Sequence, residues 1–238
     1  SSNSNGSITS SVLANTDAGF SIGTFTGTGS AGTLGHGLSS APEWIILKSR
    51  GSTADWLIYH KDITDSPTHI MFLNATNKNT DQSRFNDTNP TSSVFSVGPN
   101  NAENQSGINY VFYCFHGVEG YSKFGSYVGN AQNYSNGTFV YTGFRPSLVV
   151  VKADGTTSNW VVTDNKRASS FNGDTARLYW NTSGAESAYA SNRNVELFSN
   201  GFRVHGNSAS DNSNRINESF SYIYLAFAEA PFKFANAR

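Results

Sequence analysis

Short hydrophobic runs follow one another along the chain, and one pair of these runs occurs twice. The first pair is residues 44–48 and 56–59, and the second is residues 148–152 and 160–163. In both pairs a Lys ends the first run, a polar segment with a Gly follows, and a Trp opens the second run. Two β-rich runs that a Gly turn separates predict a β-hairpin. The pattern therefore predicts two hairpins of the same kind.

The segments on either side of the hairpins recur in the same order, which predicts an internal duplication. The corresponding segments are 33–38 and 139–144, 72–74 and 179–181, 94–98 and 201–205, and 110–115 and 222–227. We expect an N-terminal lead-in with a short strand over residues 1–19, a first β repeat over 20–119 and a second over 120–238. Trp56 and Trp160 are equivalent in this scheme and are expected in the core.

The spacing of the runs predicts an all-β fold. Strand-like runs recur at intervals of about 8–15 residues with Asn, Gly, Ser and Asp between them, and helical periodicity is nearly absent. We predict an antiparallel β-sandwich of the jelly-roll or concanavalin A-like kind, built from two duplicated halves. Short strands are expected near residues 7–14 and 20–26, and a single helical turn over residues 184–190.

Three runs are apolar at consecutive positions rather than at every second one: residues 44–47, 110–115 and 149–151. A strand with one face in water alternates hydrophobic and polar residues, so both faces of these strands should be covered. The cover could be the partner repeat, long loops or another subunit. The pattern is therefore compatible with a homo-oligomer, for example a trimer.

Composition excludes several classes of partner. The 238 residues carry a formal charge of −1, and Lys and Arg are scattered, so we predict no nucleic-acid partner. We also predict no membrane insertion, since no run reaches the roughly 18 apolar residues that a membrane span needs. The single cysteine, Cys114, lies inside an aromatic run and is expected to be a buried apolar residue.

Motifs for catalysis and for metal binding are missing from the sequence. No two acids have the spacing of a glycosidase pair, the five His lack zinc-site spacing, and no G-x-S-x-G elbow occurs. Glu119 and Glu229 close the two aromatic strands at equivalent places, which indicates a repeated structural role. Residues 81–87 or 211–214 could hold Ca²⁺ but lack EF-hand spacing. We therefore predict no catalytic residue, no metal site and no cofactor.

The Asn-rich loops allow two interpretations. Asn favours tight turns, and amides beside aromatic rings can also bind sugars. Trp180 lies beside Asn181 near a loop and is the best candidate for stacking on a sugar. The candidate ligand-binding residues are Trp180, Asn181, Asn86, Asp87, Asn104 and Asn214.

Four segments of the chain resemble a known family. Residues 121–130, 139–146, 198–202 and 222–238 are similar to the C-terminal region of virion or tail-fibre-like proteins of marine bacteriophages, including cyanophages. The resemblance extends from about residue 6 onward and implies a phage structural protein with a concanavalin A-like, lectin-like sandwich. It supplies no catalytic or ligand residues. It also implies that this region ends a longer polypeptide, so the absence of an initiating Met predicts a fragment or a processed product.

These observations lead to three functional hypotheses. The first is a non-enzymatic structural module on the phage surface or tail fibre, which contacts other virion proteins and binds host-surface glycan with avidity from repeated copies. The second is a purely architectural virion or fibre subunit. The third is a depolymerase that cleaves host polysaccharide.

Overall fold

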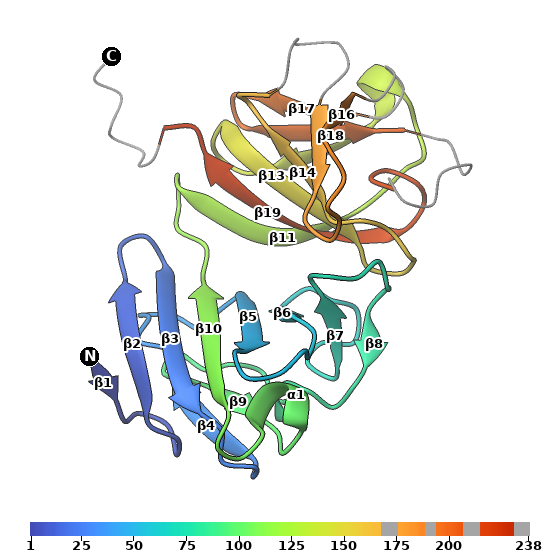
Figure 1. Ribbon diagram of the computed structural model, residues 1–238. Helices are drawn as coiled ribbons and strands as arrows, with labels where there is room; N and C mark the ends of the chain where they lie inside the picture. The colour runs from blue at the N-terminus through green and yellow to red at the C-terminus, as the bar shows by residue number, and fades with distance from the viewer. Residues whose placement is uncertain (168–175, 189–193, 207–214, 231–238) are drawn as a thin grey trace. The chain divides into compact units, whose positions relative to one another are not determined.

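The protein divides into two compact units, each described below by itself. The computed structural model describes residues 1–167, 176–188, 194–206 and 215–230 (Figure 1). Unit 1 comprises Ser1–Leu73 and Asn79–Val118, and unit 2 comprises Asn74–Lys78 and Glu119–Arg238. The short segment Asn74–Lys78 thus belongs to unit 2 although its sequence neighbours belong to unit 1.

Unit 1 is built on a large antiparallel sheet and a small one, as the prediction of an all-β fold requires. The large sheet contains, in spatial order, β1 (Ser2–Asn3), β2 (Ser10–Asn15), β3 (Phe20–Thr26), β10 (Asn109–Phe115), β5 (Trp44–Ser49), β6 (Leu57–His60), β7 (His69–Phe72) and β8 (Thr80–Asp81). The small sheet pairs β4 (Gly32–Gly35) with β9 (Val94–Val97). Two short helices, η1 (Phe85–Asp87) and α1 (Asn101–Asn104), lie in the connections.

Unit 2 has the same plan. Its large sheet contains β11 (Ser122–Val128), β19 (Ser221–Ala228), β13 (Pro146–Ala153), β14 (Val161–Asp164), β15 (Ala176–Tyr179) and β16 (Ser187–Ala188). Its small sheet contains β12 (Thr138–Tyr141), β18 (Gly201–His205) and β17 (Asn194–Phe198), and η2 (Tyr134–Asn136) precedes β12. The aromatic closing strand lies beside the hairpin in both units: β10 lies between β3 and β5, and β19 lies between β11 and β13. That the two units arose by an internal duplication remains a prediction.

Both predicted hairpins are confirmed. Ile46 pairs with Ile58 in β5–β6, and Val150 pairs with Val162 in β13–β14. The carbonyl of Trp56 accepts a hydrogen bond from the Leu73 N–H at 3.0 Å, and the carbonyl of Trp160 accepts one from the Trp180 N–H at 3.2 Å. The two Trp therefore occupy equivalent places, although Trp160 is buried and Trp56 is half-buried.

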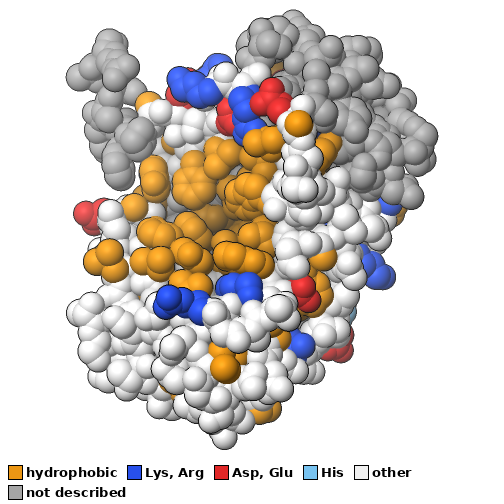
Figure 2. Space-filling view, in the orientation of Figure 1, with side chains coloured by type: hydrophobic (Ala, Val, Ile, Leu, Met, Phe, Trp, Pro, Cys, Tyr) orange, Lys and Arg blue, Asp and Glu red, His pale blue; other side chains and the backbone are white. Residues whose placement is uncertain are grey.

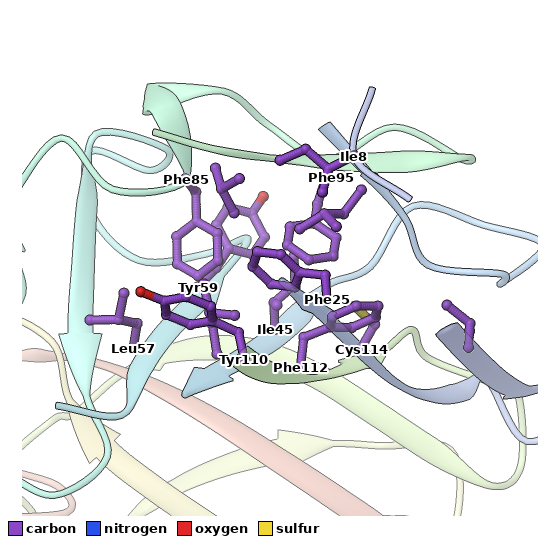
Figure 3. Packing of buried hydrophobic residues seen from close by; sticks show 14 of the residues in the cluster. Ile8, Phe25, Ile45, Leu57, Tyr59, Phe85, Phe95, Tyr110, Phe112 and Cys114 are labelled. Carbon is purple, nitrogen blue, oxygen red and sulfur yellow. The ribbon is translucent and has the colours of Figure 1, made fainter. Parts of the chain in front are cut away.

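The core of unit 1 is largely aromatic. Figure 3 shows the side chains of Phe25, Phe85, Phe95 and Phe112 pointing toward one another between the sheets. The ring centroids of Phe95 and Phe112 lie 5.1 Å apart in an edge-to-face arrangement, which aromatic quadrupoles favour. Cys114 belongs to the same cluster and is fully buried, and burial raises the pKa of its thiol. The prediction of a buried cysteine is therefore confirmed.

The core of unit 2 lies between its large and small sheets. Tyr127 and Tyr222 stack with their ring centroids 4.9 Å apart, and Phe202 meets Tyr224 edge-to-face at 5.3 Å. Val150, whose side chain points to the opposite side of β13 from this cluster, is buried as well. The consecutive apolar residues of this strand therefore correspond to burial on both faces.

The N-terminal region, where the sequence predicts a lead-in with a short strand, contains the two strands β1 and β2. Ser2 and Asn3 form β1 and pair with Ser11 and Ser10 of β2, which continues the large sheet of unit 1 at its edge. The strand expected near residues 7–14 begins at Ser10, and the strand expected at 20–26 has those bounds. Polar residues at a sheet edge can still satisfy their backbone groups by pairing, so a polar composition does not exclude a strand.

The expected helical turn over residues 184–190 is wrong in its described part. Ser187 and Ala188 form β16 and pair with Arg177 and Ala176. A helix occurs instead at Asn101–Asn104, where the side chain of Asn100 accepts a hydrogen bond from the Ala102 N–H at 2.8 Å. An Asn followed three residues later by a Glu has the spacing of a capping box, and this signal was available in the sequence.

Basic side chains are scattered over the surface, as their scattered positions in the sequence predict. On the face shown in Figure 2, the Lys and Arg side chains of the described residues lie in separate groups. Within the described part of the chain, none of the helices has the length and apolar composition of a membrane span.

Candidate functional site

The small sheet of unit 2 presents aromatic rings to solvent. On β12, Phe139 and Tyr141 are 44% and 60% exposed, whereas Val140 between them is buried. This alternation is that of a strand with one face on the core and the other in water. The outward face also carries Phe198 and Glu196 of β17 and Arg203 of β18. We call these five residues the aromatic platform.

Strand register places the platform residues in two rows. Phe139, Arg203 and Glu196 lie opposite one another across β12, β18 and β17, and Tyr141, Gly201 and Phe198 form the next row. Gly201 has no side chain, and a Cβ at this position would lie 2.9 Å from the ring of Phe139. The missing side chain therefore lets the Phe139 ring lie close to the β18 backbone.

Ring and charge contacts fix the platform side chains. The ring centroids of Phe139 and Phe198 are 5.9 Å apart, and the guanidinium carbon of Arg203 lies 4.9 Å from the centroid of the Phe198 ring. Arg203 also pairs with Glu196 at 3.4 Å. Side chains held by such contacts have lost much of their rotamer freedom before any ligand arrives, which lowers the entropic cost of binding.

The Tyr141 end of the platform carries a further cation. The ammonium of Lys123 donates a hydrogen bond to the backbone carbonyl of Tyr141 at 2.8 Å and lies 5.4 Å from the centroid of its ring. The exposed ring is thus bordered by one Lys, and the Phe198 ring is bordered by one Arg.

The opposite face of the small sheet is anchored in the core. Val140 pairs with Phe202, and both belong to the buried cluster of unit 2 together with Val204. The outward rings therefore stand on strands whose inner side chains are fully packed. Such a surface can bind a flat apolar ring face while nearby Arg, Glu and Lys bind hydroxyl or acidic groups, an arrangement suited to sugars.

A comparison with protein families matches residues 1–231 to the family described as a domain of unknown function, DUF7483. The chain belongs to this family. Comparisons with curated proteins and with solved structures gave no match. The match to DUF7483 includes both units, and because its description states no activity, function must be argued from the geometry.

In this DUF7483 chain, the two candidates at the end of β15 differ in their contacts. Trp180 is 41% exposed. The side chain of Asn181 accepts a hydrogen bond from the Trp160 N–H at 2.9 Å and donates one to the side chain of Asn159 at 2.7 Å. Asn181 therefore holds the start of β14, whereas Trp180 presents its ring to solvent.

Asn104 is buried in unit 1 and its amide binds a neighbouring loop. Its Oδ1 accepts from the Thr28 N–H at 2.8 Å, and its Nδ2 donates to the Ser30 carbonyl at 2.6 Å. The adjacent Glu103 accepts a hydrogen bond from the Phe85 N–H at 2.8 Å. The short helix α1 thus joins the loop at Thr28 to the loop at Phe85, which is a structural contact.

Asn86 and Asp87 lie on the exposed side of that second loop. Both have positive φ, 51° and 47°. Asn and Asp tolerate this conformation better than most residues do, which accounts for them here without a ligand. Asn214 and the stretch 211–214 lie outside the described residues. In the described ranges, no group of three His, Cys, Asp or Glu could hold a metal ion.

Sequence reasoning did not single out the platform. Val140 is buried between the exposed Phe139 and Tyr141, but the exposure of a Phe or Tyr cannot be read from the sequence of one strand. The pairing of Phe139 with Arg203 joins segments more than 60 positions apart, so only the fold brings the platform together.

Proposed function

We propose that this chain is a non-enzymatic binding module that recognises carbohydrate through the aromatic platform of unit 2. The observation that carries the proposal is the pair of exposed rings, Phe139 and Tyr141, on a strand whose inner side is fully packed. Exposing large rings in water is unfavourable, so such rings commonly mark a contact surface.

Charge and hydrogen-bonding groups favour a sugar over a purely apolar partner. Arg203, Glu196 and Lys123 border the rings and offer donors and acceptors within a few ångströms of them. A sugar ring has one face of C–H groups and a rim of hydroxyls, which this combination matches. Single sites of this open kind bind weakly, and repeated copies on one particle would raise the avidity.

The phage setting is supported by the sequence resemblance alone. On that basis we propose that the module is part of a virion or tail fibre, that it contacts other virion proteins as a homo-oligomer, and that its ligand is a glycan of the host surface. The exposed platform accords with a surface position on the particle.

The first test is a glycan array probed with the purified chain, followed by calorimetric titration of any glycan that binds. We expect Tyr141→Ala or Phe139→Ala to lower the affinity by about tenfold, which corresponds to about 1.4 kcal/mol. Leu13→Ala is a matched control, because Leu13 is an exposed hydrophobic residue of unit 1 outside the platform.

Other outcomes would point to the other hypotheses. Absence of binding on a broad array would contradict the proposal and favour a purely architectural subunit. Shortening of a bound polysaccharide with time, lost on replacing a single carboxylate, would establish a depolymerase.

A further inference from the structure

Unit 1 contains a polar groove on the outward face of its large sheet. The groove has a volume of about 440 Å³ and is lined by residues of β1, β2, β3 and β10, by Thr9, and by Arg50, which directly follows β5. Its side-chain lining includes the hydroxyls of Ser11, Thr24 and Thr26 and the amide of Asn109. None of the aromatic platform residues belongs to it, so it is a separate surface.

Register explains why these hydroxyls form rows. Ser11 lies opposite Thr24, and Thr26 lies opposite Asn109. The inward neighbours, Val12 and Phe25, are buried in the core of unit 1, so the hydroxyl side chains point outward. The hydroxyl of Thr26 donates to Oδ1 of Asn109 at 2.8 Å, which leaves the Nδ2 group of Asn109 as a donor for a ligand.

Arg50 is the charged residue of the groove. Its backbone N–H donates to the Asn109 carbonyl at 2.8 Å, which places it beside the hydroxyl row. Its side chain is exposed, and within the described parts of the chain it forms no hydrogen bond or ion pair. No acidic residue lines the groove. The guanidinium therefore keeps its five N–H donors for an external acceptor.

We propose that this groove binds an acidic substituent of a carbohydrate chain, a sulfate or a carboxylate, with Arg50 holding the anion and the hydroxyl row holding the sugar. A planar guanidinium donates two parallel hydrogen bonds to such an oxyanion, which an ammonium cannot do. Hydroxyl and amide side chains both donate to and accept from sugar hydroxyls. The choice of carbohydrate as the carrier rests on the proposed function, whereas the anion site rests on Arg50 and the groove.

The test is calorimetric titration of the intact chain with three oligosaccharides: a sulfated galactan, an alginate and neutral agarose. We expect the sulfated or the uronate oligosaccharide to bind, and binding to weaken with added NaCl because it includes a charge pair. Arg50→Met should lower that affinity by at least about tenfold, and Thr24→Val by less. Lys78→Met removes an exposed charge outside the groove and should leave the affinity unchanged.

The outcomes separate this site from the platform. Binding of the sulfated galactan alone identifies sulfate as the anion, and binding of the alginate alone identifies a carboxylate. Loss of binding in Tyr141→Ala but not in Arg50→Met overturns the groove and leaves the platform standing. Loss of binding in Arg50→Met but not in Tyr141→Ala supports the groove and overturns the platform as the binding site. Equal affinity of the wild-type chain for all three oligosaccharides also overturns the anion site.

Discussion

The small sheets of the two units have matching inner faces and different outer faces. Leu34 pairs with Phe95 in unit 1, and Val140 pairs with Phe202 at the corresponding place in unit 2. All four side chains are buried. On the opposite face, Thr33 and Gly35 of unit 1 correspond to Phe139 and Tyr141 of unit 2. Gly35 is buried against the side chain of Asn3, and Thr33 exchanges hydrogen bonds with Ser7. The comparison shows that the two small sheets keep their buried pairs, whereas the other face is covered by N-terminal residues in unit 1 and carries exposed rings in unit 2.

The turn that follows each of these strands is built in the same way. Gly37 and Gly143 both have positive φ, 74° and 87°. The Leu38 N–H donates to the imidazole of His36 at 3.1 Å, and the Phe144 N–H donates to the hydroxyl of Thr142 at 3.4 Å. Different side chains therefore supply the same local hydrogen bond after the two strands.

The largest effect on stability should come from the buried Phe that each unit carries at the corresponding place in its own core. Phe95→Ala and Phe202→Ala each remove a fully buried ring, and we expect each to lower the free energy of unfolding by about 3–5 kcal/mol. Urea unfolding of the two variants would check this. A cost below about 1 kcal/mol for either variant would show that the two inner faces are not equivalent.

The free energy of unfolding should depend on pH through a buried acid of unit 1, Glu103. Burial raises the pKa of Glu103 to about 7, so the folded chain keeps a proton that the unfolded chain loses above its ordinary pKa of 4.5. The free energy of unfolding should therefore fall between these pH values, by on the order of 3 kcal/mol, and change no further above pH 7 from this group. Glu103→Gln should remove the fall. Glu43→Gln, which alters a partly exposed acid, should preserve it, and parallel curves for the wild type and Glu103→Gln would contradict the assignment.

The Lys one residue before the end of the first hairpin strand should contribute more to stability in unit 2 than in unit 1. The ammonium of Lys152 is buried and donates to the carbonyls of Thr76 and Ser158 at 2.9 and 2.7 Å, whereas Lys48 is partly exposed and donates to those of Ser49 and Ser52. Removing a donor from buried carbonyls leaves them unpaired, so Lys152→Met should cost about 2–3 kcal/mol and Lys48→Met less than about 1 kcal/mol. Thermal unfolding of both variants would test this order, and equal costs would refute it.

Burial also lowers the pKa of Lys152 to about 7, with Asp154 acting in the opposite direction. The unfolded chain binds this proton up to pH 10.5 and the folded chain only up to about 7. This group therefore makes the free energy of unfolding rise between those values, opposite in sign to the contribution of Glu103 at lower pH.

The smallest effect on stability should come from the platform. Phe139→Ala and Tyr141→Ala alter exposed side chains, so each should change the free energy of unfolding by no more than about 0.5 kcal/mol. Urea unfolding measured beside the calorimetric titrations would show this. A cost of several kcal/mol would mean that the rings serve the fold rather than a ligand.

The sequence contained much of the fold because its signals are local. The hairpin runs, their Gly turns and the aromatic closing strands are all confirmed, since each depends on a few adjacent residues. The short helix at Asn101–Asn104 is not among the predicted elements, and the edge strand at Ser187–Ala188 falls where a helical turn is expected. Two to four residues carry little periodicity, so tertiary contacts decide their conformation.

The candidate sites could not be located in the same way. Asn104 and Asn181 are polar residues in polar loops, yet their amides bind the chain itself at Thr28 and Trp160. The platform and the groove depend on which strands become neighbours and on which face points outward. Strand register over long sequence separations determines both, and no local pattern contains it.

Whether the two exposed rings of unit 2 bind the ligand can be tested by replacing both with small polar residues. The double variant Phe139→Thr and Tyr141→Ser would be titrated with the glycan that the wild-type chain binds best, and its unfolding would be measured in parallel. We expect a folded protein that has lost at least about tenfold in affinity. A folded double variant with unchanged affinity would contradict it.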